Sequence, residues 1–187
     1  MRYKDICGHV NSIDGFLMPG QEEWLFNMAK SLEDKSIILE IGSYKGRSTS
    51  ALAFGCVGTG KRVFTIDEFY SFKKGSSSAP FKKNMKRLGL EKYVILLEGF
   101  SEDIAQVWRK SINIPIDFLF MDGSHDYETV VNDYRNFSEF VVSGSLIALH
   151  DVFCEGHSGC TRAWRKVLKR ELISHGECKS IAFGKKR

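Results

Sequence analysis

The sequence predicts a doubly wound α/β fold in which helices cover both faces of a mostly parallel sheet. Short apolar, β-branched runs alternate along the chain with longer segments of helical periodicity. This alternation is typical of parallel strands joined by crossover helices. With 187 residues, of which 43% are hydrophobic and 27% charged, we expect one domain over residues 1–187. We expect its first 19 residues to form an irregular N-terminal arm that includes a short helix.

Helices and strands are assigned by the spacing of apolar residues. Apolar residues three and four apart predict helices over residues 21–32, 48–54, 81–90, 101–108, 127–140 and 161–173. Short β-branched or alternating runs predict strands over residues 37–41, 62–66, 93–97, 116–121, 145–149 and 179–183. Gly89 ends one helix, Ser101 caps another, and Ser143-Gly144 forms a turn before the fifth strand. With a single strand after its last helix, the chain is too short for a full antiparallel strand pair at its end.

One connection is longer than the others. Residues 69–80 carry a Ser- and Lys-rich centre, residues 73–78, that lacks packing residues. Because this loop leaves the edge of the sheet where ligands bind, we expect it to close over a bound ligand.

The first predicted strand leads into a glycine turn. The apolar run of residues 37–41 is interrupted by Glu40, and Gly42 and Gly46 bracket a tight turn before a helix that begins near Ser48. A strand, a glycine turn and a helix N-terminus together direct backbone N–H groups toward a ligand. Glu40 is the unusual residue, because a buried carboxylate is costly unless it meets hydrogen-bond donors.

Two other nucleotide-binding patterns fit less well. The dinucleotide fingerprint requires glycine at the first, third and sixth positions, but Tyr44 and Arg47 occupy the last two of these. Residues 55–62 nearly match a phosphate-binding loop, except that Arg62 replaces the hydroxyl residue that holds magnesium. They also follow a helix and precede a strand, the reverse of the required order. We interpret them as a glycine turn that ends a helix.

Polar residues lie at or directly after the ends of five successive strands. In open α/β sheets, ligands bind outside the carboxyl ends of the strands. The residues concerned are Glu40, Asp67, Ser101, Asp122, His125, His150 and Asp151.

These motifs, in this order, resemble class I S-adenosylmethionine (SAM)-dependent methyltransferases over roughly residues 20–184. Within that class the chain is similar to the small O-methyltransferases that include macrocin-type and cephalosporin-biosynthesis relatives. The matching segments are residues 40–48, Asp67, and residues 98–101, 120–127 and 149–152. The resemblance implies a Rossmann-like sheet, SAM as cofactor, and methyl transfer to a hydroxyl oxygen of a small-molecule acceptor.

The resemblance also implies where SAM is held. Residues 42–48 would bind its methionine end, Asp67 its ribose, and Phe100-Ser101 its adenine. The candidate cofactor-binding residues are Glu40, Gly42, Ser43, Tyr44, Ser48, Asp67, Glu68, Phe100 and Ser101.

Catalytic and metal-binding roles follow from the same resemblance. His125 and Asp122 are the candidate catalytic residues, with His125 as the general base, a role that an ordinary histidine pKa near 6.5 suits. Asp122, His150 and Asp151 would hold a divalent cation. Because metal-using relatives carry a carboxylate where this chain has His150, we expect Mn²⁺ to bind more tightly than Mg²⁺. The structural alternatives are that Asp122 or His125 caps the following helix, and that no metal binds.

Other functions stay open from the sequence. Cys154, His157 and Cys160 have the ligand types and spacing of a zinc loop, against which we weigh free thiols. A noncatalytic nucleotide- or SAM-binding module and an NAD-linked enzyme are the alternatives to a methyltransferase. A net charge of +4 does not predict a nucleic-acid partner, and two lysine- and arginine-rich clusters read as solvated helix faces. We expect a cytoplasmic protein with no membrane segment and a small-molecule acceptor, either monomeric or a homodimer.

Overall fold

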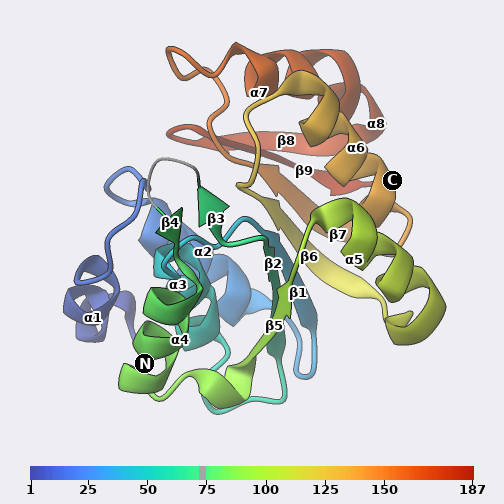
Figure 1. Ribbon diagram of the computed structural model, residues 1–187. Coiled ribbons are helices and arrows are strands. Elements are labelled where there is room, and N and C mark those ends of the chain that lie inside the picture. Colours follow the sequence, from blue (N-terminus) through green and yellow to red (C-terminus); the bar gives the residue numbers. More distant parts are fainter. Residues whose placement is uncertain (72–74) are drawn as a thin grey trace.

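The computed structural model describes residues 1–71 and 75–187, and a seven-stranded sheet runs through its centre (Figure 1). The strand order is β5-β2-β1-β6-β7-β9-β8. The first five strands in this order pair in parallel, and β9 and β8 add an antiparallel pair beside β7. The strands of this sheet are β1 (Ile37–Ile41), β2 (Arg62–Asp67), β5 (Val94–Glu98), β6 (Ile116–Met121), β7 (Val141–Leu149), β8 (Leu172–Cys178) and β9 (Ile181–Lys186). The predicted doubly wound, mostly parallel sheet is confirmed.

Helices cover both faces of the sheet, which divides the core in two (Figure 1). One face is covered by η1 (Tyr3–Asp5), α1 (Cys7–Asn11), α2 (Gln21–Ser31), α3 (Arg47–Gly55) and α4 (Ser78–Arg87). The other is covered by α5 (Ser101–Val107), η3 (Trp108–Ile112), α6 (Tyr127–Ser138), α7 (Ser158–Ala163) and η4 (Trp164–Leu168), followed by α8 (Lys169–Glu171). A short turn, η2 (Glu91–Tyr93), precedes β5. Since both faces of β1 and β6 are buried, these strands are apolar along nearly their whole length.

The turn after α3 is a helix end and not a phosphate loop. Gly58 adopts a left-handed conformation with φ of 83°. Lys61 is buried, and its Nζ donates to the carbonyl oxygens of Ala29, Lys30 and Leu32 at 2.8–2.9 Å. The ammonium therefore binds the last carbonyls of α2, where a positive charge is favourable. The interpretation of this segment as a helix-ending turn is confirmed.

Two sequence predictions near the end of the chain were wrong. The predicted last helix ends at Glu171, and the following residues form β8, which pairs with β9 as a full antiparallel hairpin. Lys186 belongs to β9, and its Nζ donates to the carbonyl oxygens of Ser138 and Val141, both at 2.7 Å. β7 begins at Val141, so Ser143-Gly144 lies inside a strand and not in a turn before one.

Residues 72–74, in the predicted closing loop, lie outside the described part of the chain. On either side of them, β3 (Tyr70–Ser71) pairs with β4 (Gly75–Ser76), and α4 begins three residues earlier than predicted. The backbone N–H of Ser77 donates to the carbonyl oxygen of Phe69 at 2.9 Å, which joins the two ends of this segment.

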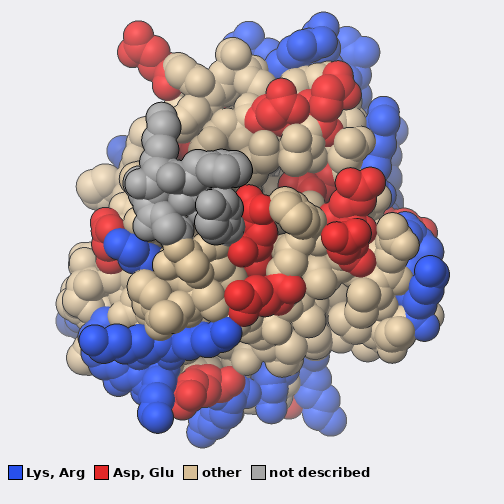
Figure 2. Space-filling model, in the orientation of Figure 1, with Lys and Arg blue, Asp and Glu red and all other residues tan. Residues whose placement is uncertain are grey.

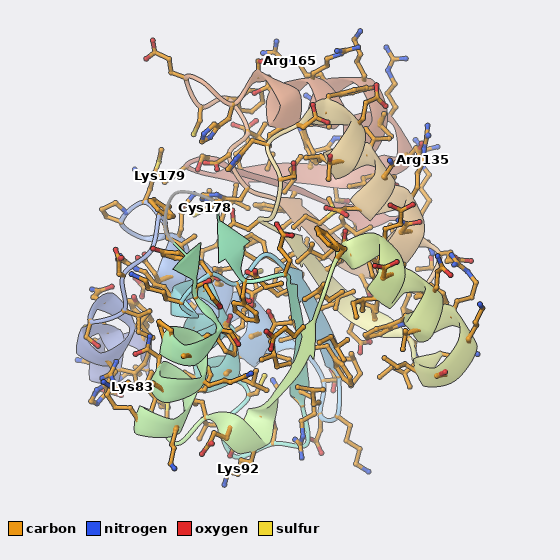
Figure 3. The ribbon with its side chains drawn as sticks, in the orientation of Figure 1. Lys83, Lys92, Arg135, Arg165, Cys178 and Lys179 are labelled. Carbon is orange, nitrogen blue, oxygen red and sulfur yellow. The ribbon has the colours of Figure 1, made fainter. Side chains whose placement is uncertain are left out.

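The basic clusters form outer faces, as predicted. In α4, and in the helical segment from α7 to α8, the lysines and arginines are exposed while the apolar residues between them are buried. Figure 3 shows Lys83 and Arg165 of these clusters at the margin of the molecule, away from the strand ends of the central sheet. No helix in the described residues is long and apolar enough to cross a membrane.

Candidate active site

A cleft of about 1090 Å³ opens at the carboxyl ends of the parallel strands. Its described lining residues come from the ends of β1, β2, β5, β6 and β7 and the turns that follow them, from α6, from the residue before α4 and from the N-terminal arm. They include seven carboxylate residues but a single arginine, Arg47. Figure 2 shows Asp and Glu side chains gathered along the middle of this face, with Lys and Arg around its margin. The cleft therefore favours a ligand that carries positive charge.

The glycine turn after β1 has the geometry that the sequence predicts. Gly42 and Gly46 have φ of 87° and 90°, and Tyr44 between them has φ of 49°. A Cβ on Gly42 would lie 2.3 Å from the carbonyl oxygen of Asp122, so no side chain fits where the ends of β1 and β6 meet. Ser43, Tyr44 and Ser48 line the cleft beside this turn, as proposed for cofactor contacts.

Asp67 holds the turn in place from the tip of β2. Its Oδ2 accepts the backbone N–H groups of Ser43 and Tyr44, both at 2.7 Å, and its Oδ1 accepts that of Phe69 at 2.6 Å. A carboxylate has about four lone-pair sites, and Oδ2 also lies 3.4 Å from the hydroxyl of Ser43, so the second site of Oδ1 is the one that remains for a ligand hydroxyl. Asp67 and Glu68 both line the cleft. Asp67 thus supports the turn as well as lining the cleft, a structural role that the sequence did not indicate.

Glu40 does not reach the cleft, contrary to its prediction as a cofactor contact. Its side chain is fully buried, and Oε2 accepts hydrogen bonds from the hydroxyls of Thr49 at 2.5 Å and Thr65 at 2.9 Å. Burial raises the pKa of Glu40 to about 7, against hydrogen bonds that act to lower it. Oε1 has no partner among the described residues, which suits a protonated carboxyl. Glu40 therefore ties β1 to α3 and β2 beneath the turn.

The raised pKa of Glu40 predicts a loss of stability with rising pH. The folded chain holds the proton up to about pH 7, whereas the unfolded chain releases it near the ordinary value of 4.5. The stabilisation is complete below pH 4.5 and is lost as the pH approaches 7, by about 2–3 kcal/mol between pH 5 and pH 8. Glu40→Gln, which does not titrate, is expected to lose that much less over this interval in urea unfolding. An equal pH dependence in both proteins would contradict a raised pKa at Glu40.

Asp122, His150 and Asp151 converge behind the cleft. Nδ1 of His150 lies 2.8 Å from Oδ1 of Asp122 and 3.3 Å from Oδ1 of Asp151, and these three side chains form one of two groups in the described residues that could hold a metal ion. Nδ1 is buried, yet neither contact has hydrogen-bond geometry. Burial acts to lower the pKa of His150, but the negative charge of Asp122 outweighs it and raises that pKa to about 10. The group thus attracts a positive charge to this position.

The opposite ring nitrogen of His150 is held by Gln21, a residue that the sequence gave no reason to single out. Nε2 lies 3.0 Å from Oε1 of Gln21, whose Nε2 donates to the hydroxyl of Ser180 at 2.9 Å. Since that amide oxygen is an acceptor, it requires a proton on Nε2 of His150. Nδ1 then faces the two carboxylates, where it carries a second proton when the ring is charged and can bind a metal ion when that proton is lost.

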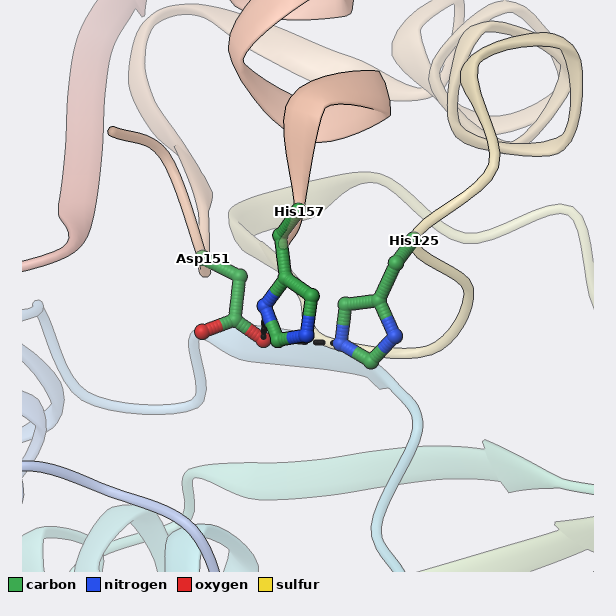
Figure 4. Close-up of side chains that lie close together, drawn as sticks. All are labelled: His125, Asp151 and His157. Atoms are coloured by element: carbon green, nitrogen blue, oxygen red, sulfur yellow. Dashed lines mark hydrogen bonds and ion pairs between the residues drawn. The ribbon is translucent and has the colours of Figure 1, made fainter. Parts of the chain in front are cut away.

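Asp151 also joins His125 and His157 (Figure 4). Its Oδ2 lies 2.7 Å from Nε2 of His125 and 3.2 Å from Nδ1 of His157, and Asp151 has a left-handed φ of 57°. The two imidazole rings stack with centroids 4.0 Å apart and planes 13° apart. Because the lone pairs of an imidazole lie in its ring plane, two parallel rings cannot direct them at one ion. We therefore interpret this group as a carboxylate that orients histidines, and not as a metal site.

His125 is half-exposed, and its Nε2 is held by Asp151. Its hydrogen bond to Asp151 raises its pKa, although partial burial acts against this shift. Burial would raise the pKa of Asp151, but the hydrogen bond from His125 and the nearby charge of His150 outweigh it and lower that pKa. Neither Asp122 nor His125 caps the next helix, because Asp126 accepts the N–H groups of Glu128 and Thr129 there.

A zinc loop, the alternative to free thiols at Cys154, His157 and Cys160, does not assemble. His157 faces Asp151, and the thiol of Cys160 is buried, 3.8 Å from the carbonyl oxygen of Ser124. The two metal-capable groups in the described residues include neither Cys154 nor Cys160, and all five cysteines are free.

Several cleft residues have no signal in the sequence. Phe16 and Met18 of the N-terminal arm are exposed apolar side chains in the cleft wall. Gly159 permits α7 to approach the loop after β6, since a Cβ there would lie 2.1 Å from the carbonyl oxygen of His125. Asp133 of α6 is buried and accepts the hydroxyl of Ser101 at 2.5 Å. These residues lie in segments whose patterns predict only an irregular arm or helices.

Comparison with known proteins identifies the family. The model of the methyltransferase-domain family matches residues 39–152, more than half of the chain. The chain therefore belongs to this methyltransferase family, and the resemblance drawn from its motifs is confirmed at the level of family.

Solved structures share the fold over nearly the whole chain. The O-methyltransferase of Bacillus cereus, in complex with S-adenosylhomocysteine (SAH), superposes with a TM-score of 0.74 at 21% identity, covering 98% of this chain and 90% of that one. The O-methyltransferase TomG of Streptomyces achromogenes, in complex with SAM, superposes with a TM-score of 0.69 at 17% identity, covering 90% and 79%.

One curated relative is an uncharacterized protein, R132, of Acanthamoeba polyphaga mimivirus. It is 27% identical over 131 residues, which cover 68% of this chain and 57% of that protein. The chain thus spans a little over half the length of the curated relative that it matches.

Proposed function

We propose that this chain is a SAM-dependent methyltransferase that transfers a methyl group to a hydroxyl oxygen of a small-molecule acceptor. The observation that carries the proposal is the turn of residues 42–48, clamped by Asp67 at the edge of a family-matched methyltransferase sheet. SAM supplies an activated methyl on a sulfonium, so the protein's task is mainly to align the acceptor with it. The sulfonium and the ammonium of SAM also suit the carboxylate-rich cleft.

The proposed binding mode places SAM along successive strand ends. Its methionine end lies at the turn of residues 42–48, its ribose hydroxyls at Asp67 and Glu68, and its adenine at Phe100 and Ser101. Asp67, Glu68, Phe100, Ser101 and most residues of the turn line the cleft, and the tips of β1, β2 and β5 lie in this order along the sheet. Glu40 supports the turn from beneath.

His125 is the proposed general base. Asp151 fixes Nε2 of His125, which leaves Nδ1 as the ring atom that can accept the acceptor's hydroxyl proton. The carboxylate of Asp151 then stabilises the imidazolium that forms, as it would in any carboxylate–histidine pair. The ring of His157 stacks on one face of the His125 ring and limits its rotation.

The residues at the ends of β6 and β7 fit a divalent cation. The buried Nδ1 of His150, with two carboxylate oxygens within 3.3 Å and no hydrogen-bond geometry to either, is the observation that supports this fit. Asp122, His150 and Asp151 would hold the ion, which would polarise the acceptor's hydroxyl and lower its pKa. With one nitrogen ligand we expect a transition metal, Mn²⁺ before Mg²⁺.

The cation proposal predicts the effect of chelation. Treatment with EDTA is expected to abolish formation of SAH, and Mn²⁺ is expected to restore it at lower concentration than Mg²⁺. His150→Asp, which exchanges the nitrogen ligand for oxygen, is expected to shift this preference toward Mg²⁺. Full turnover after exhaustive chelation would show that His150 carries a proton in place of the metal.

The reaction itself is tested by SAH formation from SAM across a panel of phenols, catechols and sugars. The account predicts SAH, with matching O-methylated product, for at least one acceptor. Methylation only of amines, thiols or carbon atoms would overturn the assignment to oxygen. We keep the cytoplasm as the proposed location, since free thiols are typical of a reducing compartment.

A further inference from the structure

Asp133 is a buried carboxylate in the cleft wall that none of the roles above uses. It lies on the inner face of α6, where the other buried residues are Val130, Val131, Tyr134 and Phe137. Its side chain is about 5% exposed and contributes to the lining of the cleft. An apolar residue at this position would avoid the cost of burying a carboxylate. The carboxylate is therefore expected to meet a donor that repays this cost.

One such donor is the hydroxyl of Ser101, which holds a single oxygen of Asp133. The Oγ–Oδ1 distance of 2.5 Å is short, and it joins the first residue of α5 to the middle of α6. Burial raises the pKa of Asp133 to about 6, against this hydrogen bond. Oδ2 accepts no hydrogen bond from the described residues, and it is not fully buried. It is therefore accessible from the cleft that Asp133 lines.

The place of Asp133 along the cleft indicates what Oδ2 would meet. The inference rests on the proposed function, in which SAM runs from the turn after β1, past Asp67, to Ser101 after β5. Asp133 faces Ser101 and so lies at the end of the cofactor furthest from the methionine. Adenine presents its exocyclic amino group on the edge away from the ribose, and an amino group is a donor that a carboxylate accepts.

We propose that Asp133, positioned by Ser101, accepts a hydrogen bond from the exocyclic amino group of the cofactor's adenine and thereby selects adenosyl over inosyl ligands. An inosyl ligand carries a carbonyl oxygen in place of that amino group. Two acceptors would then face each other in a desolvated position, so the ligand is rejected because a buried carboxylate loses its partner. We expect a preference of about 10- to 100-fold for the adenosyl ligand.

The test compares SAH with S-inosylhomocysteine, its deaminated counterpart, by calorimetry on the full chain. Wild type is expected to bind SAH about 10- to 100-fold more tightly. In Asp133→Asn the amide can donate to the carbonyl oxygen, so the preference is expected to fall to about threefold or less, or to reverse. Ser101→Ala, which frees the carboxylate, is expected to reduce the preference partially. Asp103→Asn, the same change at an exposed position of α5, is the matched control and should leave it unchanged.

The outcomes separate this role from a structural one. If Asp133 only ties α6 to α5, then Asp133→Asn weakens both ligands by the same factor, which would overturn the proposal. Equal affinity of wild type for both ligands would do so as well. Thermal unfolding of each variant shows whether it is folded, and Ser101→Ala supplies the comparison if Asp133→Asn is not. If wild type binds SAH tightly and Asp133→Asn leaves the SAH-to-S-inosylhomocysteine affinity ratio unchanged, this inference alone is wrong. If wild type does not bind SAH, the proposed function is wrong as well.

Discussion

Replacing Asp67 with alanine is expected to weaken SAM binding by about 100-fold or more. The variant loses the acceptor proposed for the ribose hydroxyls, and it also releases the N–H groups of Ser43, Tyr44 and Phe69 that shape the turn. A hydrogen bond to a charged group contributes about 1.5–3 kcal/mol, and each 1.4 kcal/mol or so changes affinity tenfold. Losing the ribose contact alone therefore lowers SAM affinity by more than about tenfold, and the disorder of the turn brings the loss to about 100-fold. Calorimetric titration of SAM or SAH into both proteins measures the change.

Glu155→Ala is the matched control for Asp67→Ala. It removes one negative charge from the same cleft, but Glu155 makes no recorded contact with the turn. An affinity loss of only a few fold is expected there, from electrostatics alone. If Asp67→Ala and Glu155→Ala weaken SAM equally, the clamp on the turn is not what holds the cofactor.

Replacing His125 with alanine is expected to lower kcat by about 10²–10⁴-fold while SAM affinity stays within about twofold. His125 lies at the end of the cleft near Asp151, and no contact of its side chain supports the turn of residues 42–48. The loss therefore concerns proton removal from the acceptor and not cofactor binding. It is measured as the rate of SAH formation with an acceptor that wild type methylates.

Two further variants sharpen the result at His125. His9→Ala, at an exposed histidine of α1, should leave the rate unchanged. His157→Ala removes the ring that stacks on His125 but keeps the contact between His125 and Asp151. We therefore expect a smaller loss of rate than for His125→Ala. A rate for His125→Ala within threefold of wild type would rule out a general-base role and leave alignment as the source of catalysis.

The parts of the site that the sequence predicts are those fixed by local spacing. Gly42, Gly46 and Asp67 follow their strands at short, regular distances, and parallel strands bring such residues to one edge. Asp122 and Asp151 are placed by the same rule. The glycine turn needs left-handed backbone at Gly42 and Gly46, which is why its residue types show in the sequence.

The rest depends on contacts between distant segments, which no local pattern records. Gln21 meets His150 across 129 positions of the chain. In the sequence, Asp133 is one more polar residue of an amphipathic helix. Its hydrogen bond with Ser101 is seen only in the structure. β8 was missed because its residues, mixed in polarity and mostly exposed, lack the alternation of a buried strand. Its pairing with β9 determines its structure.

The same limit applies to the metal-capable groups. His157 has zinc-loop spacing with two cysteines, yet in the structure it faces Asp151 and stacks on His125. Spacing along the chain therefore gave the ligand types correctly but the partners wrongly. Glu40 likewise stands out as a strand-end carboxylate, and only its burial shows that it supports the turn.

Whether the cleft binds SAM at the turn clamped by Asp67 is decided by calorimetric titration of wild type with SAM, SAH and NAD in turn. We expect one binding site per chain for SAM and for SAH, with NAD giving no measurable heat of binding. Saturable binding of NAD, with none of SAM or SAH, would show that the turn is a dinucleotide site and overturn the assignment.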